Sequence, residues 1–305
     1  MYHEDMALPG TIRITDVGPR DGLQNESQSV ATASKVQLVD RLQHAGVAEV
    51  EVSGFVRPDR IPQLADASEV FDGIERVEGV LRSALVPNER GWEAAQAAGV
   101  DKIAVFTSAS ESFSRGNINC SIAESLERFV PVVRAARTAS IPVRAYVSCA
   151  VACPHEGPVD PDAVVNLVSS LLEMGVDEID LGDTIGMATP EDIERLLESC
   201  SSVVEPGDLT LHLHDTGRGA LACCLHAMHL GVHSFDTSCG GLGGCPFAPG
   251  ASGNLATEDL VRCCQLLGVH TGVNLAAIRE AAAGIEDELG RGPASITGMA
   301  MASQA

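Results

Sequence analysis

Residues 34–52 read Ser-Lys-Val-Gln-Leu-Val-Asp-Arg-Leu-Gln-His-Ala-Gly-Val-Ala-Glu-Val-Glu-Val, and the order of structure that they predict recurs along the chain. Residues 34–45 have the apolar spacing of an amphipathic helix. Gly46 suits the left-handed backbone conformation in which helices commonly end. Residues 49–52 read as a β-strand. The stretch therefore predicts a helix, a tight glycine turn and a strand in direct succession.

The same turn occurs four times in the chain, and a strand-like run begins two residues after each valine. The four copies are Ala45-Gly46-Val47, Ala98-Gly99-Val100, Met174-Gly175-Val176 and Leu230-Gly231-Val232. The strand-like runs are 12–17, 49–52, 83–86, 102–107, 143–148, 178–181, 209–213 and 234–238. Helical patterns lie between them at 34–45, 89–98, 122–136, 161–174, 190–204 and 219–230.

Eight alternations of strand and helix favour a parallel sheet that closes into a TIM (β/α)8 barrel. A doubly wound open sheet uses similar turns, but the chain lacks the G-x-G-x-x-G element that would favour it. The 305 residues suit a single catalytic domain over 1–305, because a TIM barrel takes about 250 residues. We expect the barrel at about 11–270 and a short helical extension at about 271–305, with a poorly ordered tail after Gly290.

Composition and charge argue against a nucleic-acid-binding, membrane-spanning or secreted protein. The formal net charge of −22 argues against nucleic acid as a partner, because phosphates would be repelled. The chain has no apolar run of 18 residues and no basic-then-apolar leader, so we expect neither a membrane span nor a secretory signal. Ten cysteines without an export signal predict reduced thiols and a cytoplasmic location.

The seventh strand carries the most informative polar residues, in Leu209-Thr210-Leu211-His212-Leu213-His214-Asp215. Side chains alternate across a strand, so His212 and His214 point to one face and their leucine neighbours to the other. Helices cover the outside of a barrel, so we expect both histidines to point inward. A pair of hydrogen-bonded core histidines is the alternative, and the H-x-H spacing favours a metal site.

Two other strand ends carry groups that suit the same site. Arg20 and Asp21 follow strand one in Asp16-Val17-Gly18-Pro19-Arg20-Asp21-Gly22, where Asp21 could bind a cation and Arg20 an oxyanion. A structural ion pair is the alternative. Glu51 lies in strand two, and Asp183, which could instead cap the turn at Gly186, follows strand six.

A glycine-rich loop at 240–254 follows strand eight and can approach a ligand closely. Its thiol, Cys245, could transfer a proton, or it could be a loop cysteine with no role. Asn254 could cap the following helix or place its amide oxygen on a metal ion. The sequence leaves these alternatives open.

Seven stretches together resemble the 3-hydroxy-3-methylglutaryl-CoA lyase family: residues 16–26, 50–56, 117–121, 143–149, 181–186, 212–216 and 241–260. The loop with Cys245 and the sequence Gly-Asn-Leu-Ala-Thr-Glu-Asp behind it is the most specific of them. The resemblance implies a TIM-barrel lyase of leucine catabolism that takes a CoA thioester and forms a homodimer. Its products would be acetyl-CoA and acetoacetate, formed by retro-Claisen cleavage.

The resemblance also implies roles for individual residues. Four resemble ligands of Mg²⁺ or Mn²⁺: Asp21, His212, His214 and Asn254. Arg20 resembles the residue that stabilises the enolate, and Cys245 the thiol that transfers a proton to the two-carbon product. The general base would be His212 or Asp21. Two acids support the site, Glu51 and Asp183, and three residues resemble pocket-lining positions: Gln24, Asn117 and Arg144.

Several positions depart from the family and leave the acyl group open. Gly54 and Asp180 replace serines, and Gly217-Arg218 replaces Tyr-Gly. We expect each of these positions to lie near the barrel mouth, so the substrate could instead be citramalyl-CoA or a longer 3-hydroxyglutaryl-CoA. An acetyl-CoA-dependent synthase is less favoured, because such enzymes resemble the barrel but carry further C-terminal regions. A non-catalytic barrel is disfavoured by the complete ligand set. The absence of the animal enzymes' cysteine-bearing tail suggests a bacterial-type enzyme.

Overall fold

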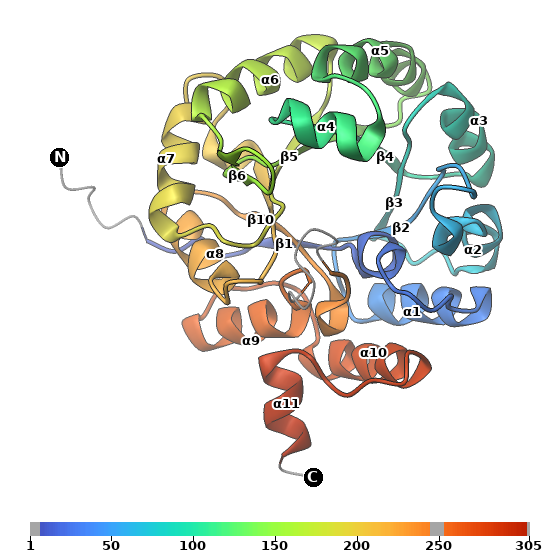
Figure 1. Cartoon of the computed structure of the whole chain (residues 1–305). Helices are drawn as coiled ribbons and strands as arrows, with labels where there is room; N and C mark the ends of the chain where they lie inside the picture. The colour runs from blue at the N-terminus through green and yellow to red at the C-terminus, as the bar shows by residue number, and fades with distance from the viewer. Residues whose placement is uncertain (1–6, 245–252, 304–305) are drawn as a thin grey trace.

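The computed structural model describes residues 7–244 and 253–303, and within them eight parallel strands close into a barrel in the order β1-β10-β9-β8-β5-β4-β3-β2. The strands are β1 (Arg13–Asp16), β2 (Glu49–Gly54), β3 (Leu81–Leu85), β4 (Lys102–Ser108), β5 (Val143–Ser148), β8 (Glu178–Asp183), β9 (Leu209–Leu213) and β10 (Ser234–Thr237). Helices surround this ring (Figure 1). The predicted TIM barrel is confirmed.

All six predicted helices are present, at α1 (Thr32–His44), α3 (Glu89–Ala98), α5 (Ile122–Thr138), α6 (Pro161–Met174), α7 (Pro190–Cys200) and α8 (Ala220–His229). The sequence patterns missed two shorter helices, α2 (Ala67–Gly73) and α4 (Glu111–Ile118), and a hairpin of β6 (Ala152–Cys153) and β7 (Gly157–Pro158). Figure 1 shows α4 drawn in across one end of the barrel, inside the ring of outer helices. These short elements decorate the barrel and do not alter its topology.

The repeated glycine turn has the predicted conformation at all four positions. The backbone φ angles are +90° at Gly46, +70° at Gly99, +95° at Gly175 and +96° at Gly231. A side chain would strain the backbone in this region, and glycine has none. The turn ends each helix sharply and delivers the chain to the next strand of the barrel.

The apolar core lies between the strands and the helices and is built mainly from branched aliphatic side chains. Ile14, Val105, Val147, Leu181 and Leu211 are at most 1% exposed. These residues occupy strand positions that point toward the helices, which leaves the alternate positions for the barrel interior. The low aromatic content therefore does not prevent a well-filled core.

The barrel interior contains a layer of paired charges. Arg144 is 1% exposed, with Nη2 2.6 Å from Glu178 Oε1 and Nη1 2.8 Å from Asp236 Oδ1. Lys102 Nζ lies 2.8 Å from Glu49 Oε2. Buried charges are costly unless they are paired, so each group depends on its partners. This layer supports the polar residues at the carboxyl ends of the strands.

Three helices follow the barrel: α9 (Thr257–Leu267), α10 (Leu275–Glu288) and α11 (Ile296–Ala302). The backbone N–H groups of Ile296 and Thr297 donate to the Asp259 carboxylate at 3.0 and 2.7 Å. Carboxylates stabilise helix N-termini, so Asp259 fixes the start of α11. The expectation of a poorly ordered tail after Gly290 is therefore wrong at residues 296–302, where composition alone gave no sign of this contact.

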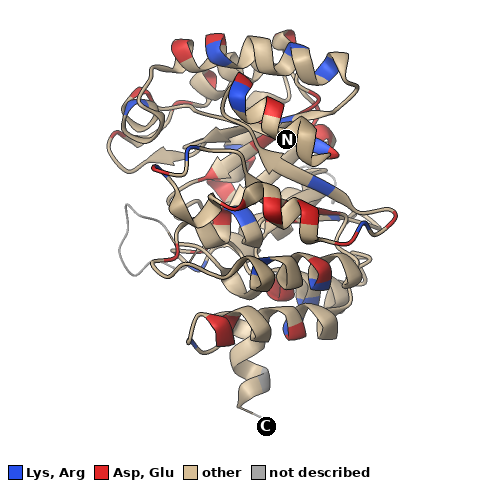
Figure 2. Cartoon of the chain, turned by 90° about the vertical axis from the view of Figure 1, so that its right-hand side faces the viewer, with Lys and Arg blue, Asp and Glu red and all other residues tan. Residues whose placement is uncertain are grey.

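Acidic and basic residues are spread over the outer helices (Figure 2). Among the described residues, none of the helices is both long enough and apolar enough to cross a membrane.

Candidate metal centre and active site

One carboxylate and two imidazoles converge at the carboxyl end of the barrel. Asp21 lies in the five-residue π-helical turn η1 (Gly18–Gly22) that follows β1, while His212 lies in β9 and His214 directly after it. Nε2 of His212 is 3.8 Å from Asp21 Oδ2, and Nε2 of His214 is 3.9 Å from the same atom. Mg²⁺ binds its ligands at about 2.1 Å, so atoms up to about 4.2 Å apart can contact one ion.

The two histidines differ in electrostatic state. Burial lowers the pKa of His214 to about 4, and the neighbouring His212 adds to this effect. Burial also opposes the charged form of His212, but its hydrogen bond to Asp236 and the charge of Asp21 raise its pKa overall. His214 is therefore a neutral imidazole, the form that binds metal ions.

Asp21 is held as a carboxylate. Burial alone would raise its pKa, but Arg20 and the two histidines outweigh burial and lower it to about 2. An ionised oxygen ligand beside the neutral His214 imidazole suits a divalent cation. The donor atoms present therefore fit the implied Mg²⁺ or Mn²⁺.

Asn254 lies against the same carboxylate oxygen. Its Nδ2 is 2.9 Å from Asp21 Oδ2 and 3.1 Å from the Leu242 carbonyl oxygen. Helix α9 begins only at Thr257, after an N-cap at Ala256. The helix-cap interpretation of Asn254 is therefore wrong. Its side chain lies beside Asp21, and we call the four candidate ligands Asp21, His212, His214 and Asn254 the metal-binding group.

Arg20 connects this group to Glu51. Its Nε donates to Glu51 Oε2 at 2.6 Å, and its Nη1 donates to Asp21 Oδ1 at 2.8 Å. The guanidinium carbon also lies 5.2 Å from the centre of the Tyr146 ring. These contacts fix a buried positive charge next to the metal-binding group, and Arg20 is only 5% exposed.

Gln24 and Glu51 both lie next to the Arg20–Asp21 pair. Gln24 Nε2 donates to Asp21 Oδ1 at 2.9 Å. Glu51 is fully buried, and burial raises its pKa in spite of the Arg20 charge. Both residues therefore help to hold the Arg20–Asp21 pair in place.

Three predicted site residues lie apart from this group. Arg144 sits in the interior charge layer, with its guanidinium paired to protein carboxylates. Asp183 accepts hydrogen bonds from the backbone N–H of Gly186 and Ala188, as the turn-cap alternative predicted. Burial raises the pKa of Asp183 to about 6 despite these bonds. Asn117 is exposed on α4.

Cys245 lies outside the described residues, but the two ends of its loop meet beside the metal-binding group. A Cβ added to Gly253 would lie 2.5 Å from the Gly243 carbonyl carbon, and one on Gly243 would lie 3.0 Å from Asn254 Nδ2. Gly243 also has a φ of +113°. Only glycine fits such a close approach, which explains the glycines at the base of the loop.

Sequence reasoning missed two residues of the site. The Tyr146 hydroxyl lies 3.1 Å from Glu51 Oε2, and its ring meets His212 edge-on at 5.9 Å. Asp236 Oδ2 lies 3.2 Å from His212 Nδ1. The sequence contains a feature that could have indicated each of these two residues. Tyr146 shares a strand face with Arg144, and Asp236 is a charged residue inside the short β10 run.

The three departures from the family lie in different surroundings. Asp180 is fully buried in β8, two positions below the level at which Gly182 pairs with His212. The expectation that Asp180 lies near the barrel mouth is therefore wrong, because strand position alone does not give depth. Gly54 ends β2 at the carboxyl end of the barrel, but a Cβ there would lie 3.3 Å from both Leu64 Cδ1 and Leu85 Cβ, so it would face apolar packing. Arg218 does lie beyond β9, with a φ of +58° and its side chain 55% exposed.

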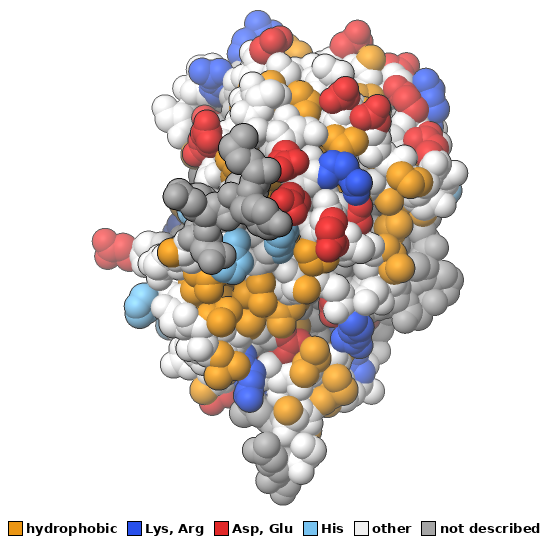
Figure 3. All heavy atoms as spheres, turned by 90° about the vertical axis from the view of Figure 1, so that its left-hand side faces the viewer, with side chains coloured by type: hydrophobic (Ala, Val, Ile, Leu, Met, Phe, Trp, Pro, Cys, Tyr) orange, Lys and Arg blue, Asp and Glu red, His pale blue; other side chains and the backbone are white. Residues whose placement is uncertain are grey.

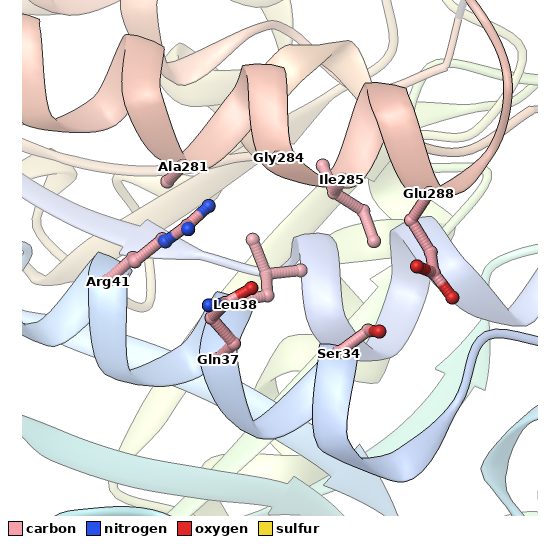
Figure 4. A pocket seen from close by; sticks show the side chains of 8 residues that line it. All are labelled: Ser34, Gln37, Leu38, Arg41, Ala281, Gly284, Ile285 and Glu288. Carbon is pink, nitrogen blue, oxygen red and sulfur yellow. The ribbon is translucent and has the colours of Figure 1, made fainter.

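Two hollows in the structure are lined by other residues. A cavity of about 30 Å³, room for one water molecule, lies between α1 and α10 beside Leu38 and Ile285 (Figure 4). A hollow of about 390 Å³ lies between the β6–β7 hairpin and α7, beside Val159 and Arg195. None of the residues of the metal-binding group lines either hollow.

A sequence profile described as HMGL-like matches residues 11–285 of this chain. The chain belongs to the HMGL-like family. Hydroxymethylglutaryl-CoA lyases from Bos taurus and Pseudomonas mevalonii are 50% and 47% identical to it, so the chain is a carbon–carbon lyase, in agreement with the predicted resemblance.

Relatives in the HMGL-like family match the chain over most of its length. A hydroxymethylglutaryl-CoA lyase from Pseudomonas mevalonii is 47% identical, over 96% of this chain and 97% of the relative. The crystal structure of a hydroxymethylglutaryl-CoA lyase from Pseudomonas aeruginosa matches with a TM-score of 0.95 and 47% identity, over 98% and 99% of the two chains. An HMG-CoA lyase from Acinetobacter baumannii, solved with coenzyme A and 3-methylmalate, matches with a TM-score of 0.90 and 36% identity, over 94% of each chain.

Proposed function

We propose that this HMGL-like protein cleaves 3-hydroxy-3-methylglutaryl-CoA to acetyl-CoA and acetoacetate in a divalent-metal-dependent retro-Claisen reaction. The observation that carries the proposal is the convergence of Asp21, His212 and His214 on one point, with the Arg20 guanidinium bonded to the same Asp21. A carbon–carbon lyase for such a substrate has two tasks, removal of a hydroxyl proton and stabilisation of an enolate.

Asp21, His214 and Asn254 would hold Mg²⁺ or Mn²⁺, together with His212 Nε2. When bound, the ion would act as a Lewis acid that makes the substrate's tertiary hydroxyl easier to deprotonate. Arg20 and Gln24 both donate hydrogen bonds to Oδ1 of Asp21. Oδ2 of Asp21 therefore faces the two histidines. The carboxylate is thereby oriented for ligation.

His212 is the better of the two candidates for the general base. The pKa of Asp21 is about 2, so this carboxylate is a poor proton acceptor, whereas the pKa of His212 is raised. Nδ1 of His212 is engaged with Asp236, so only Nε2 can accept the substrate proton. Nε2 has one lone pair, so His212 would accept the proton only while Asp21, His214 and Asn254 alone hold the ion.

Arg20 supplies the positive charge for the enolate oxygen of the departing acetyl-CoA. Glu51 and Asp21 fix two of its donor nitrogens, so the guanidinium is positioned before the substrate arrives. Such preorganised charge lowers the energy of a developing oxyanion. Cys245 would then protonate the enolate carbon. Gly243 and Gly253, at the two ends of its loop, meet beside Asn254, which supports a loop that starts and ends next to the reacting groups.

The placement of Gly54 and Asp180 favours the parent substrate over citramalyl-CoA or a longer 3-hydroxyglutaryl-CoA. Gly54 adds no space at the mouth, because its missing side chain would meet Leu64 and Leu85. Asp180 is fully buried in the interior charge layer, beside Arg144. Neither departure enlarges the acyl site, so neither supports a different acyl group.

A comparison of substrates tests this proposal. Purified protein with Mg²⁺ or Mn²⁺ is incubated separately with 3-hydroxy-3-methylglutaryl-CoA and with citramalyl-CoA, and both products are measured. We expect equal amounts of acetyl-CoA and acetoacetate from the first thioester and a much lower kcat/KM with the second. Faster turnover of citramalyl-CoA would contradict the substrate assignment. If the protein condensed acetyl-CoA with a keto acid and did not cleave 3-hydroxy-3-methylglutaryl-CoA, the proposed direction of the reaction would be wrong.

We also propose that the enzyme acts in the cytoplasm as a homodimer. Large hydrophobic side chains are exposed on α9 and α11, including Leu266 at 78% and Ile296 at 56%, and a second copy could cover them. Hydrophobic side chains gather in the lower half of the face shown in Figure 3. Light scattering after gel filtration should give twice the chain mass of 31.8 kDa, and a monomer would refute this assignment.

A further inference from the structure

Asp180 is a buried carboxyl group that the proposed mechanism does not use. It lies in β8, paired in register with Tyr146 on one side and Thr210 on the other, and it is fully buried. Neither of its oxygens accepts a hydrogen bond from any of the described residues. Its nearest cationic group is Arg144, whose Nη1 is 3.6 Å from Oδ2. An ionised carboxylate in this position would be poorly compensated.

The neighbouring Asp236 takes the donors that Asp180 lacks. Arg144 Nη1 donates to Asp236 Oδ1 at 2.8 Å, and His212 Nδ1 lies 3.2 Å from Oδ2. The Tyr146 hydroxyl is 3.3 Å from the same Oδ2. Ligand atoms of Asp180, His212 and Asp236 all lie within 4.8 Å of one another. Two buried carboxyl groups therefore sit together, and only one is well supplied with hydrogen bonds.

Two carboxyl groups that close cannot both be ionised at neutral pH without strong repulsion. Asp236 has the cation and the donors, so it is the ionised member. Asp180 keeps the proton, which burial and the Asp236 charge both favour by raising its pKa well above the usual range. A protonated carboxyl is a donor, and the acceptor that faces it is Asp236.

We propose that Asp180 is a positioning residue that remains a neutral carboxylic acid, donates a hydrogen bond to Asp236, and so fixes the carboxylate that orients His212. Asp236 in turn holds Nδ1–H of His212 and leaves Nε2 directed at Asp21. Carboxylate partners behind a ligating histidine set its tautomer and ring orientation. The role toward the metal rests on the proposed function, whereas the proton on Asp180 does not.

A second cation at Asp180, Asp236 and His212 is the other arrangement that these atoms could form. The Arg144 guanidinium occupies that space, at 2.8 Å from Asp236 and 3.6 Å from Asp180. A cation there would be repelled by this buried charge, so the geometry favours the proton.

Infrared difference spectroscopy tests the proton directly. Wild-type protein and Asp180→Asn are compared at neutral pH without added metal, with aspartate labelled by heavy carbon at its side-chain carboxyl. We expect a carbonyl band of a protonated carboxylic acid in the wild type that shifts with the label and is absent from Asp180→Asn. If Asp180→Asn removes no such band, Asp180 is ionised and the proposal is overturned.

Binding of Mn²⁺, followed by electron paramagnetic resonance without substrate, tests the positioning role. Asp180→Asn keeps a donor for Asp236 and should retain an affinity near that of the wild type. Asp180→Val has similar size but no donor, and should bind Mn²⁺ about tenfold or more weakly, as is usual when a partner of a ligand is lost. Equal affinities for the two variants, whether both retained or both reduced, would overturn the positioning role.

Circular dichroism and thermal melting establish that each variant is folded before its affinity is compared. If Asp180→Val does not fold, Asp180→Ala provides the same comparison without a donor. If the wild type itself binds no Mn²⁺, the positioning role and the metal-dependent part of the proposed function both fail. The infrared experiment needs no metal and still decides whether Asp180 carries a proton.

Discussion

Nε2 of His212 lies 3.8 Å from Oδ2 of Asp21, although one residue is in β9 and the other follows β1. The barrel brings them together because β1 and β9 both pair with β10. Asp236 on β10 then holds the other nitrogen of His212. Three neighbouring strands of the barrel thus position Asp21, His212 and the Asp236 carboxylate that orients His212.

Removal of the His214 imidazole should weaken metal binding and leave the fold largely unchanged. His214→Gln should weaken Mn²⁺ binding by more than about tenfold, since loss of even an indirect partner of a ligand can cost that much. Isothermal titration calorimetry measures the Kd. His233→Gln is the matched control, because His233 is exposed and its ring is hydrogen-bonded to the Gly231 carbonyl rather than to the metal-binding group. Equal affinity in the two variants would remove His214 from the metal-binding group.

Loss of the fixed positive charge should reduce catalysis far more than it weakens metal binding, although Arg20 also orients Asp21. Arg20→Gln should reduce kcat by about 10²–10³, the usual cost of removing a group that stabilises an oxyanion. Steady-state kinetics and Mn²⁺ titration of the same sample separate the two effects. Arg76→Gln is the control, because Arg76 donates to the Gly99 carbonyl in a turn that precedes a strand, at the other end of the barrel. A kcat close to that of the wild type in Arg20→Gln would argue against enolate stabilisation by Arg20.

The thiol of the glycine-rich loop can be tested separately from the metal-binding group. Cys245→Ser should lower kcat by about 10²–10⁴, because the hydroxyl is a far weaker acid than the thiol. Its affinity for Mn²⁺ should not change, since no thiol is needed as a ligand. Cys263→Ser on α9 is the control. An unchanged rate in Cys245→Ser would mean that another group protonates the enolate.

The interior charge layer should contribute to stability in a pH-dependent way. Burial alone would raise the pKa of Glu178, but Arg144 and Lys102 outweigh it and lower the pKa from 4.5 to about 2. The stabilisation is therefore complete above about pH 4.5 and is lost as the pH falls toward 2. Glu178→Gln should lower the free energy of unfolding at neutral pH by about 3 kcal/mol.

Urea denaturation of wild type and Glu178→Gln across this pH range checks the effect. The difference between the two proteins should shrink as the pH falls, because the wild-type carboxylate becomes protonated. Glu127→Gln, at an exposed position on α5, serves as the control and should change little. A difference that does not depend on pH would mean that Glu178 acts by packing alone.

Much of the fold follows from the sequence because local patterns and global topology agree. Strands β5 and β9 and helices α3 and α6 have the predicted bounds, since a glycine turn, a helix cap or a strand edge marks each limit. Short elements such as α2 and α4 were missed, because seven or eight residues carry too little periodicity.

The metal-binding group was predictable because strand alternation fixes the faces of His212 and His214, and the barrel places strand ends together. Depth was not predictable. Arg144 and Asp180 lie on inward-facing positions, yet they pair within the interior charge layer rather than with a ligand at the mouth. Only the register between strands reveals that difference.

The most direct measurement for the central claim is cleavage by metal-depleted protein. Chelator-treated enzyme is supplied with 3-hydroxy-3-methylglutaryl-CoA, and acetyl-CoA release is followed as Mg²⁺ or Mn²⁺ is added back. We expect no release without metal, restoration on addition, and no restoration in His214→Gln at the same metal concentration. Full activity in the chelated enzyme, or full restoration in the variant, would contradict a metal-dependent reaction at Asp21, His212 and His214.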